Sequence, residues 1–368
     1  MKPKRILHVI SALAPGGAET MVRGLAIEMQ LRKNAQSGIA YIASAADQGR
    51  DPAFEADFLK RLSDAGIPTY ELGNQTRKNV LLGAIRLRGV VAKFRPNLIH
   101  IHLGYGLLFR ALSWLDVPTI YTNHYVTSTF PAFLFRWFDR TITEYVSICR
   151  ECDAFLKRVA KKPVTLIYNG SSSGVSRPPR SEPNGQVFRL LSVGSLTLRK
   201  NFPMLIDVVD AVSRELQKEG RSIVCEIAGS GECLDELKDL VCAKKLVGVV
   251  NFLGQRSDIE ALMNTADVMI MTSKGEGLPI TLIEAAHAAL PMIATDVGGC
   301  REIVSDGVNG YLVPDGDSEL MVQRLLKLIH EPDSYVAFSA KASESAQTFS
   351  LANCTTSHEA LYARLAKA

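Results

Sequence analysis

Two glutamates eight positions apart bracket a turn between a predicted strand and a predicted helix. The segment reads EGLPITLIE, with Glu276 at its start and Glu284 at its end. A strand-like run, DVMIMTS, precedes it, and a helix-like run, IEAAHAA, follows. Proline is favourable in a first helical turn, because its missing N–H would have no partner there. The pattern therefore predicts Glu276 in a loop and Glu284 about one turn inside a helix.

The start of this helix has the properties of an anion site. Its free amides and positive dipole end point back toward the loop, which suits a pyrophosphate. Gly277 and Leu278 are the useful amide donors, since Pro279 has no N–H. One carboxylate can then reach a substrate hydroxyl from the loop, and the other can reach ribose hydroxyls from the helix.

The elements that must position these residues alternate between short strand-like runs and longer helical patterns. Such alternation predicts parallel sheets covered by helices on both faces. A segment rich in Ser, Pro and Gly, residues 171–186, has the composition of a linker. We therefore expect an α/β fold of two doubly wound domains, residues 1–175 and 186–348, followed by a helix over 349–368. In such sheets ligands bind at the carboxyl ends of the strands. The expected strands are 5–10, 39–43, 98–102, 119–122, 145–148 and 165–168 in the first domain, and 189–193, 224–228, 249–253, 268–271, 292–295 and 311–313 in the second.

Composition is that of a globular protein of the cytoplasm. The 368 residues are 47% hydrophobic, enough for two cores, and no apolar run reaches the roughly 18 residues that span a bilayer. The apolar stretch near the start, RILHVI, precedes Pro-Gly-Gly, which is a turn and not a cleavage site. The odd number of cysteines, seven, favours a reducing compartment. Cys149 and Cys152 are expected to be ordinary thiols.

Charge is divided unevenly between the two predicted domains. Residues 1–175 hold 23 Lys and Arg against 13 Asp and Glu, whereas acidic residues exceed basic ones in the remainder. The segment Arg77–Arg95 has six basic residues, no acidic one and apolar residues at helical spacing. It is either a basic amphipathic helix on an anionic membrane surface or a core-packed helix with a basic solvated face. We expect no nucleic-acid partner.

The late part of the chain resembles one enzyme family along its length. The Glu, seven residues, Glu pattern continues through LPMIATDVGGCREIVSDGVNGYLVPDGD, residues 290–317. This region resembles the retaining glycosyltransferases of family 4 (group 1), which have the GT-B fold of two facing Rossmann-like domains. The resemblance implies transfer of a sugar from a UDP- or GDP-sugar to a hydroxyl acceptor, in envelope polysaccharide or lipopolysaccharide synthesis or on a lipid-linked glycan. It implies a cytoplasmic protein, peripheral on the inner face of the plasma membrane where the acceptor is lipid-linked.

In the first domain the resemblance assigns roles to two loops. APGGAET resembles the family's GGAE motif, so Gly16 and Gly17 would lie against the donor phosphates or the transferred sugar. His124 matches the active-site histidine that contacts the transferred sugar. His100 and His102 alternate onto one face of a strand, and either shape the pocket or are ordinary structural histidines.

In the second domain the resemblance assigns the phosphate clamp. Lys200 matches the family's lysine, but Ser195 stands where an arginine is common. Either Arg199 would take over from a different angle, or Ser195 would only hydrogen-bond to the donor. Gly229 and Arg256 lie in loops that resemble the nucleobase pocket. The family arrangement would gather Glu276, Lys200 and the diphosphate opposite His124 across a cleft. The last helix would return to the first domain.

The mechanism follows from the same residues. The family implies retention of configuration without a settled enzymic nucleophile, the leaving diphosphate helping to deprotonate the acceptor. Glu276 would hold sugar hydroxyls and Glu284 the ribose. No metal or other cofactor is expected to be required, because no carboxylate joins His100 and His102 at a metal-like spacing. Two alternatives remain: a non-catalytic nucleotide-sugar-binding subunit, and a soluble sugar-phosphate synthase or phosphorylase. A dehydrogenase is disfavoured, since no strand is followed by G-x-G-x-x-G.

Overall fold

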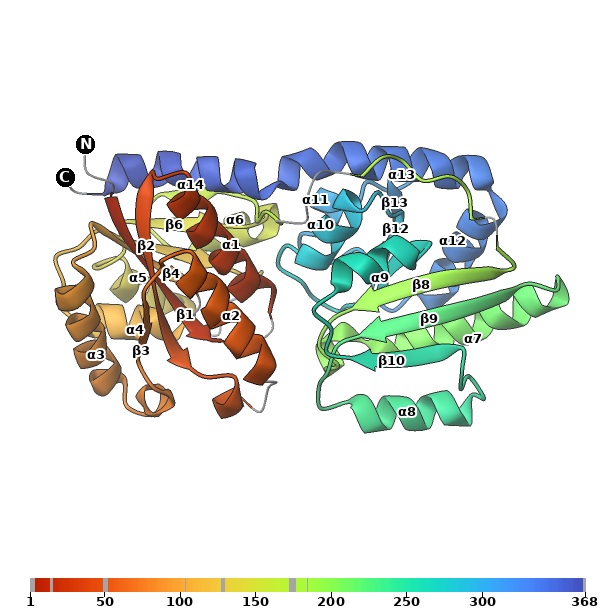
Figure 1. The fold of residues 1–368 in the computed structure, drawn as a ribbon, viewed down its shortest axis with the longest axis horizontal. Helices are drawn as coiled ribbons and strands as arrows, with labels where there is room; N and C mark the ends of the chain where they lie inside the picture. Colours follow the sequence, from red (N-terminus) through yellow and green to blue (C-terminus); the bar gives the residue numbers. More distant parts are fainter. Residues whose placement is uncertain are drawn as a thin grey trace. The chain divides into compact units, whose positions relative to one another are not determined.

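The computed structural model divides the chain into two compact units, each described by itself (Figure 1). Unit 1 comprises Met1–Ser172 and Ser350–Ala368, and unit 2 comprises Ser173–Phe349. The structure describes residues 4–13, 16–48, 52–102, 104–126, 130–171, 177–183 and 185–366. Parts of the predicted linker (172–176 and 184), of the APGGAET loop (14 and 15) and of the last predicted helix (367 and 368) lie outside these residues.

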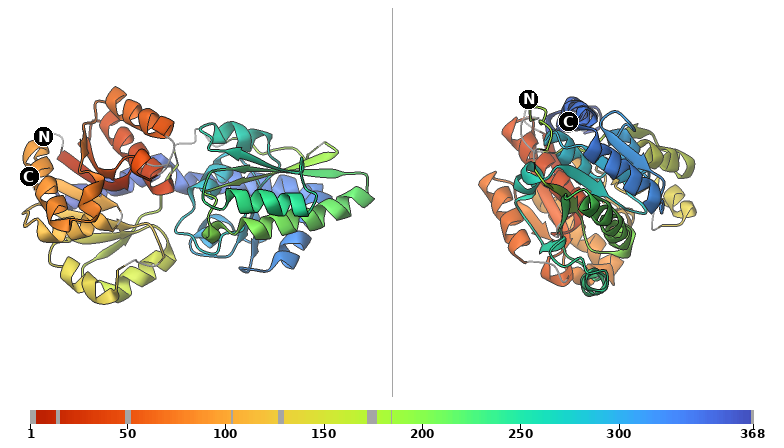
Figure 2. Two further views of the ribbon diagram at one scale, coloured as in Figure 1. Left: turned by 90° about the horizontal axis from the view of Figure 1, so that it is seen from below. Right: turned by 90° about the vertical axis from the view of Figure 1, so that its right-hand side faces the viewer.

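Unit 1 is a parallel sheet with helices on both faces (Figure 2). Its strand order in the described residues is β3-β2-β1-β4-β5-β6-β7. The chain turns outward from β1 in both directions, which defines a doubly wound sheet with its switch point between β1 and β4. The elements are β1 Lys4–Ala12, α1 Gly17–Leu31, β2 Ala35–Ala43, η1 Ala46–Gln48, α2 Pro52–Asp64, β3 Thr69–Glu71, η2 Asn74–Arg77, α3 Val80–Phe94, β4 Leu98–His102, α4 Tyr105–Leu112, β5 Thr119–Asn123, α5 Ala132–Phe138, β6 Glu144–Ser147, α6 Arg150–Val159, β7 Val164–Leu166 and α14 Leu351–Leu365.

Unit 2 repeats this winding with strand order β10-β9-β8-β11-β12-β13, all parallel. The switch point lies between β8 and β11. The loops that follow these two adjacent strands therefore emerge side by side at one edge of the sheet. The elements are β8 Val187–Val193, η3 Leu198–Lys200, α7 Phe202–Lys218, β9 Ser222–Ala228, α8 Leu234–Ala243, β10 Val250–Gly254, α9 Ile259–Thr265, β11 Val268–Met271, α10 Ile280–His287, β12 Met292–Thr295, α11 Cys300–Ile303, β13 Gly310–Val313, α12 Ser318–His330, α13 Pro332–Ala346 and η4 Gln347–Phe349.

The predicted α/β fold with two doubly wound parallel sheets is confirmed, and each predicted strand overlaps an observed one. The strand β3 was missed, because its three residues are too few to show a periodic pattern. The predicted linker needs a correction. Arg180 lies within it, yet its guanidinium donates hydrogen bonds to the backbone oxygens of Met263, Ala266 and Ala288. This part of the segment is therefore packed against unit 2.

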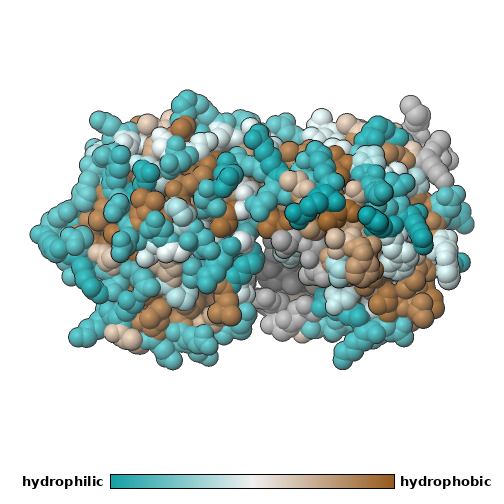
Figure 3. All heavy atoms as spheres, turned by 180° about the vertical axis from the view of Figure 1, so that it is seen from behind, coloured by the Kyte–Doolittle hydropathy of each residue, from teal (hydrophilic) through white to brown (hydrophobic). Residues whose placement is uncertain are grey.

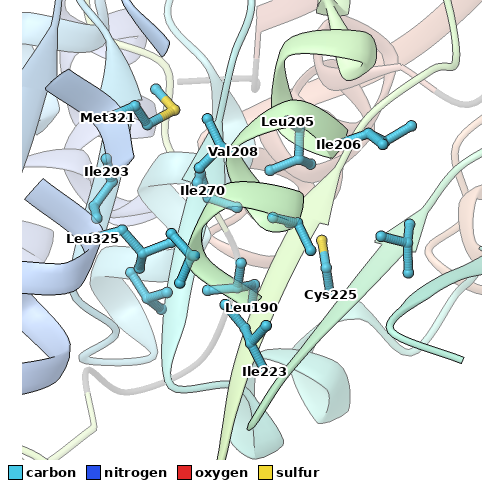
Figure 4. Packing of buried hydrophobic residues seen from close by; sticks show 14 of the residues in the cluster. Leu190, Leu205, Ile206, Val208, Ile223, Cys225, Ile270, Ile293, Met321 and Leu325 are labelled. Carbon is cyan, nitrogen blue, oxygen red and sulfur yellow. The ribbon is translucent and has the colours of Figure 1, made fainter. Parts of the chain in front are cut away.

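The core of unit 2 lies between the sheet and α7. Figure 4 shows Leu190, Ile223 and Cys225 from β8 and β9 close to Leu205 and Val208 of α7. These five residues are fully buried or nearly so. Burying each large aliphatic side chain contributes about 1.5–3 kcal/mol, so this layer is a major source of the stability of unit 2.

The returning helix α14 completes unit 1. It packs against α1, beside which it runs in Figure 1. Arg32, the C-cap of α1, and Glu359 of α14 form an ion pair of 3.4 Å, and Arg364 pairs with the buried Glu144 of β6 at 2.9 Å. Lys4 donates hydrogen bonds to the backbone oxygens of Ala363 and Ala366. Residues from both ends of the described chain thus build one domain.

The basic segment Arg77–Arg95 folds mainly as α3. Its inner face is buried through Leu87, Val91 and Phe94, whereas Leu81 and Ile85 are 64% and 65% exposed. On the face of the molecule drawn in Figure 3, hydrophilic side chains cover most of both units, with hydrophobic ones in smaller areas. No helix among the described residues is long and apolar enough to span a membrane.

Candidate functional site

Unit 2 brings a buried ion pair to the carboxyl edge of its sheet. Nζ of Lys200 lies 2.6 Å from a carboxylate oxygen of Glu276, and Nη1 of Arg199 lies 3.2 Å from the other oxygen. The Glu276 side chain is 7% exposed and that of Lys200 13%. Burial alone would raise the pKa of Glu276, but the Lys200 and Arg199 charges outweigh it and hold that pKa below its ordinary value. Glu276 is therefore ionised at neutral pH.

Hydrogen bonds between the loops after β8 and β11 hold this pair. The amide of Lys274 donates to the Arg199 carbonyl at 2.8 Å, and Nη1 of Arg199 donates to the Gly275 carbonyl at 2.6 Å. The Thr272 hydroxyl lies within hydrogen-bond distance of the carbonyls of Lys200 and Asn201. Since β8 and β11 are adjacent, residues more than 70 positions apart in sequence form one rigid arrangement.

Glycines permit the close approach of further loops. A Cβ on Gly229, after β9, would collide with the Gly194 carbonyl oxygen, and a Cβ on Gly298, after β12, would collide with that of Glu276. Gly298 has φ +54°, a conformation that also favours glycine. The Lys200 side chain crosses Gly194, where an added Cβ would lie 3.1 Å from its Cε. The cationic side chain thus lies flat over the end of β8.

The helix α10 supplies backbone donors beside the ion pair. It begins at Ile280, with Pro279 as N-cap and no side-chain cap, so its first amides have no intrahelical partner. Among the described residues the amides of Gly277 and Leu278 also donate no hydrogen bond. The Gly277 carbonyl accepts from Gly299, which fixes the turn. Unpaired amides next to two cations make a site for an oxyanion.

Glu284 differs from Glu276 in having no cationic partner. It lies in the second turn of α10, and its carboxylate accepts no hydrogen bond from any described residue while remaining reachable by solvent. Burial, and less strongly the charge of Glu260, raise the pKa of Glu284 to about 7. An unpaired acceptor that is costly to ionise is suited to accept hydrogen bonds from ligand hydroxyls.

Two further predicted residues of unit 2, Ser195 and Arg256, take no part in the Lys200–Glu276 ion pair. The Ser195 hydroxyl, in the loop after β8, has no hydrogen-bond partner among the described residues. Arg256 follows the edge strand β10 and forms a two-bond ion pair with Asp258, at 2.8 and 2.5 Å. No contact among the described residues joins Arg256 to Lys200 or Glu276. The position of Arg256 at the nucleobase stays a prediction.

In unit 1, His124 stands directly after β5 on a fixed loop. The carbonyl of the next residue, Tyr125, accepts hydrogen bonds from the Asn123 amide at 2.6 Å and from the Cys152 thiol at 3.0 Å. His124 is 7% exposed, and burial lowers its pKa to about 3. It is therefore neutral at neutral pH and acts through hydrogen bonds instead of charge. Residues 127–129 of the aromatic stretch that follows lie outside the described residues.

Gly16 and Gly17 stand at the start of α1, after β1. Gly16 is the N-cap in extended conformation, and no side chain caps the helix. As at α10, the first amides lack intrahelical partners. The glycine pair leaves these amides accessible from the carboxyl edge of the unit 1 sheet.

Sequence reasoning found two of the histidines on one face of this sheet and missed two that lie with them. His8 on β1 is in register with His100 on β4, and His102 lies two residues further along the same face. His358 and Tyr362 of α14 cover this face, and the Tyr362 hydroxyl bonds Nδ1 of His100. Strand alternation could have indicated which residues of β1 share a face of the sheet with His8. The sequence gives no sign, however, that α14 covers that face. Gly298 and Thr272 were likewise assigned no role, because their contacts are long-range.

Two family descriptions match adjoining parts of the chain. Residues 177–345 match Glycosyl transferases group 1, and residues 15–172 match Glycosyltransferase Family 4. Together they cover most of the chain and nearly all of the residues that form the two candidate half-sites. The chain belongs to the group 1 glycosyltransferases. It has their GT-B fold, and transfer of a glycosyl group is its reaction class.

The relatives of this chain include a glycosyltransferase named for polysaccharide biosynthesis. An uncharacterized glycosyltransferase of Haemophilus influenzae is 26% identical over 80% of this chain and 83% of that protein. The amylovoran biosynthesis glycosyltransferase AmsD of Erwinia amylovora is 36% identical over 38% of each chain. The Anabaena protein HepE, solved in complex with UDP-glucose, has TM-score 0.81 at 20% identity, covering 98% of this chain and 100% of that one. That structural likeness shows the shared fold.

Proposed function

We propose that this glycosyltransferase moves a sugar, with retention of configuration, from a UDP- or GDP-sugar to a hydroxyl acceptor. One observation carries the proposal: the buried Lys200–Glu276 pair beside the unpaired amides of Gly277, Leu278 and the α10 N-terminus. These groups suit a diphosphate and a sugar hydroxyl at adjacent positions.

In this proposal the donor diphosphate binds the amides and replaces Glu276 in some of its contacts with Lys200 and Arg199. Both cations are held by Glu276 without a ligand, so they are oriented before the donor arrives. As the glycosidic bond breaks, negative charge grows on the leaving diphosphate, and preorganised cations and amides stabilise it. Glu276, relieved of part of its pairing, accepts hydrogen bonds from sugar hydroxyls. Glu284 accepts them from the ribose.

His124 contributes a neutral hydrogen bond to the transferred sugar. Its lowered pKa argues against a cationic role at the oxocarbenium-like transition state, where positive charge would be unfavourable. Gly16 and Gly17 offer backbone donors to the sugar or the phosphates. The leaving diphosphate removes the acceptor proton on the same face of the sugar. That the half-sites of the two units share one donor stays a prediction.

A donor screen tests the proposal. We expect UDP or GDP to raise the thermal midpoint, and ADP and CMP to have little effect. The matching nucleotide sugar should be hydrolysed slowly without acceptor. The Glu276→Ala variant should abolish turnover while circular dichroism stays unchanged. Turnover equal to that of the wild type would refute the assignment of the site. Binding with neither hydrolysis nor transfer would favour the non-catalytic subunit, for which Ser195 in the family's arginine position is the supporting observation.

Two finer parts of the proposal need their own measurements. The anomeric configuration of the first product, read by proton NMR before mutarotation, tests retention. Excess EDTA tests metal independence, which we propose because the charge on the diphosphate is met by Lys200, Arg199 and amides. A drop in turnover that added Mg²⁺ restores would overturn that part alone.

The acceptor is proposed to be a saccharide or lipid-linked glycan of envelope polysaccharide or lipopolysaccharide synthesis. The amylovoran relative supports the polysaccharide setting. Lipid linkage is supported by α3, whose exposed Leu81 and Ile85 lie one turn apart beside Arg88. Flotation with vesicles containing anionic lipid should carry the wild type and not the Leu81→Ser, Ile85→Ser double variant. No flotation of the wild type would favour a soluble acceptor and the sugar-phosphate synthase alternative.

A further inference from the structure

Three histidines of unit 1 form a continuous chain of ring nitrogens. Nδ1 of His8 lies 3.2 Å from Nε2 of His102, and Nδ1 of His102 lies 3.3 Å from Nε2 of His124. They come from β1, the end of β4 and the loop after β5, which are neighbouring strands. The chain runs from the buried interior to the histidine at the candidate site. His8 is fully buried and His102 is 1% exposed.

The ring nitrogens at both ends of this histidine chain have no hydrogen-bond partner among the described residues. Among the described residues Nε2 of His8 is buried and has no hydrogen-bond partner. At the other end, Nδ1 of His124 has no partner either, but it is not buried. His124 therefore presents Nδ1 to solvent or ligand, while its Nε2 is held by the interior.

The chain permits only two arrangements of protons. Each ring is neutral, because burial lowers the pKa of His8 and His124 to about 3 and that of His102 well below its ordinary value. A neutral imidazole has one donor and one acceptor, so all bonds in the chain must run in the same direction. Donation from His124 inward leaves an N–H on His8 Nε2. Donation from His8 outward leaves a lone pair there and places an N–H on His124 Nδ1.

Burial decides between the two directions. A buried N–H without a partner is among the rarest features of protein interiors, whereas an under-satisfied acceptor is tolerated more often. The outward direction leaves only the acceptor unsatisfied. We propose that His8 and His102 are positioning residues that fix His124 in the tautomer protonated at Nδ1, so that His124 donates to a sugar oxygen. The benefit of this tautomer for glycosyl transfer rests on the proposed function, whereas the assignment of the tautomer itself rests only on the hydrogen bonds.

The neighbouring His100 shows that burial in this cluster does not by itself make a residue part of the chain. It is fully buried on the same face, but its nitrogens bond the Thr122 hydroxyl at 2.6 Å and the Tyr362 hydroxyl. His100 thus offers a matched control: the same residue type, strand face and burial, with no hydrogen bond to His8, His102 or His124.

Nitrogen NMR of protein labelled with ¹⁵N-histidine tests the tautomer directly. We expect His124 in the wild type to be protonated at Nδ1 and not at Nε2. The variants His8→Phe and His102→Phe should release it to protonation at Nε2, whereas His100→Phe should leave it unchanged. His8→Asn, whose amide can donate to His102, should keep the wild-type tautomer. This conservative variant keeps the test informative if the His8→Phe variant does not fold.

Kinetics provide the second readout. We expect His8→Phe to lower kcat about tenfold or more with KM for the donor nearly unchanged, and His8→Asn to restore most of it. A wild type protonated at His124 Nε2, or one tautomer in every variant, would overturn the proposal. So would one equivalent of Zn²⁺ bound by the wild type and not by His8→Phe, since the nitrogens of His8, His100 and His102 lie within 4.8 Å of one another. If only the kinetics fail, the fault lies with the proposed function.

Discussion

The two units place their candidate residues at the carboxyl ends of similarly wound sheets, but by opposite electrostatic means. Unit 2 uses charge: Glu276 is held between Lys200 and Arg199. Unit 1 uses neutral groups: His124 ends a chain of buried imidazoles. The carboxylate is ionised because cations compensate its burial, whereas the histidines are neutral because nothing compensates theirs. The same sheet topology therefore supports either kind of site, and the side chains around it decide which.

The largest expected difference between the two units is the loss of stability of unit 1 at acidic pH. Burial lowers the pKa of His8 and His124 to about 3 and that of His358 to about 4, and it lowers those of His100 and His102 well below the ordinary value. Unfolded histidines take up protons below about pH 6.5 and these do not, so stability falls as pH drops through that value. Each such histidine contributes about 1.4 kcal/mol of loss per pH unit. Several kcal/mol should therefore be lost from unit 1 by pH 5.

Unit 2 provides the comparison for this experiment. Burial lowers the pKa of His287 in unit 2, and the raised pKa of Glu284 makes protonation favourable as pH falls below about 7. In unit 1 Glu19, with a pKa raised to about 7 by burial, acts in the same direction as Glu284. Both tryptophans, Trp114 and Trp137, belong to unit 1, so fluorescence follows it alone. Hydrogen exchange of β11 peptides follows unit 2. Equal losses in both units would contradict the comparison.

Removing the cation of unit 2 should have the next largest effect. We expect Lys200→Ala to lower transfer about a hundredfold or more, because a preorganised charge partner of the diphosphate is lost. Steady-state kinetics, with UDP and GDP binding by calorimetry, would measure it. The matched control is Lys274→Ala, an exposed lysine in the adjacent loop without an ion pair among the described residues. A similar loss in both variants would show a general charge effect.

The glycine contact beneath Glu276 should matter somewhat less. In Gly298→Ala the new Cβ would meet the Glu276 carbonyl oxygen, so the loop must shift. We expect a loss of about 2–3 kcal/mol in stability and roughly tenfold in transfer. Gly307→Ala is the control: its φ of +72° is also positive, but an added Cβ meets nothing within 4 Å. It should cost only about 1 kcal/mol and leave transfer unchanged. Thermal melts and initial rates distinguish the two.

The smallest expected effect is a gain in stability on replacing Glu284. The pKa of folded Glu284 is raised to about 7, so ionisation destabilises the fold as pH rises from about 4.5 through 7. Glu284→Gln should therefore be more stable than the wild type at pH 8, by roughly 1–3 kcal/mol, and nearly equal to it at pH 5. Its affinity for the nucleotide should fall, since a ribose acceptor is lost. Greater stability at pH 5 than at pH 8, relative to the wild type, would contradict the assigned shift.

Much of the fold was predictable because its signals are local. The runs at Leu98–His102, Val268–Met271 and Met292–Thr295 coincide with observed strands, since buried parallel strands are continuous and apolar. Lys200 and Glu276 were expected together from the resemblance to the family. Their direct pairing could not be derived from the sequence, since it depends on the adjacency of β8 and β11.

The histidine chain and the ion pair of Arg256 were missed for different reasons. His8 needs the register of β1 against β4 and the cover of α14, neither of which is written in local sequence. Arg256 was expected at the nucleobase from resemblance alone. That position stays a prediction, but the ion pair with Asp258, two residues further on, could have been read from the local sequence.

The return of α14 to unit 1 has a consequence for biosynthesis. The chain enters unit 2 after Ser172 and re-enters unit 1 at Ser350, so the domain begun first is completed last. On the ribosome, unit 2 is translated in full while the histidine face of the first sheet still lacks Tyr362 and His358. During that interval the histidine face lacks the cover that α14 provides in the folded chain. A cell that slows translation late in this message would prolong the exposure of one domain while sparing the other.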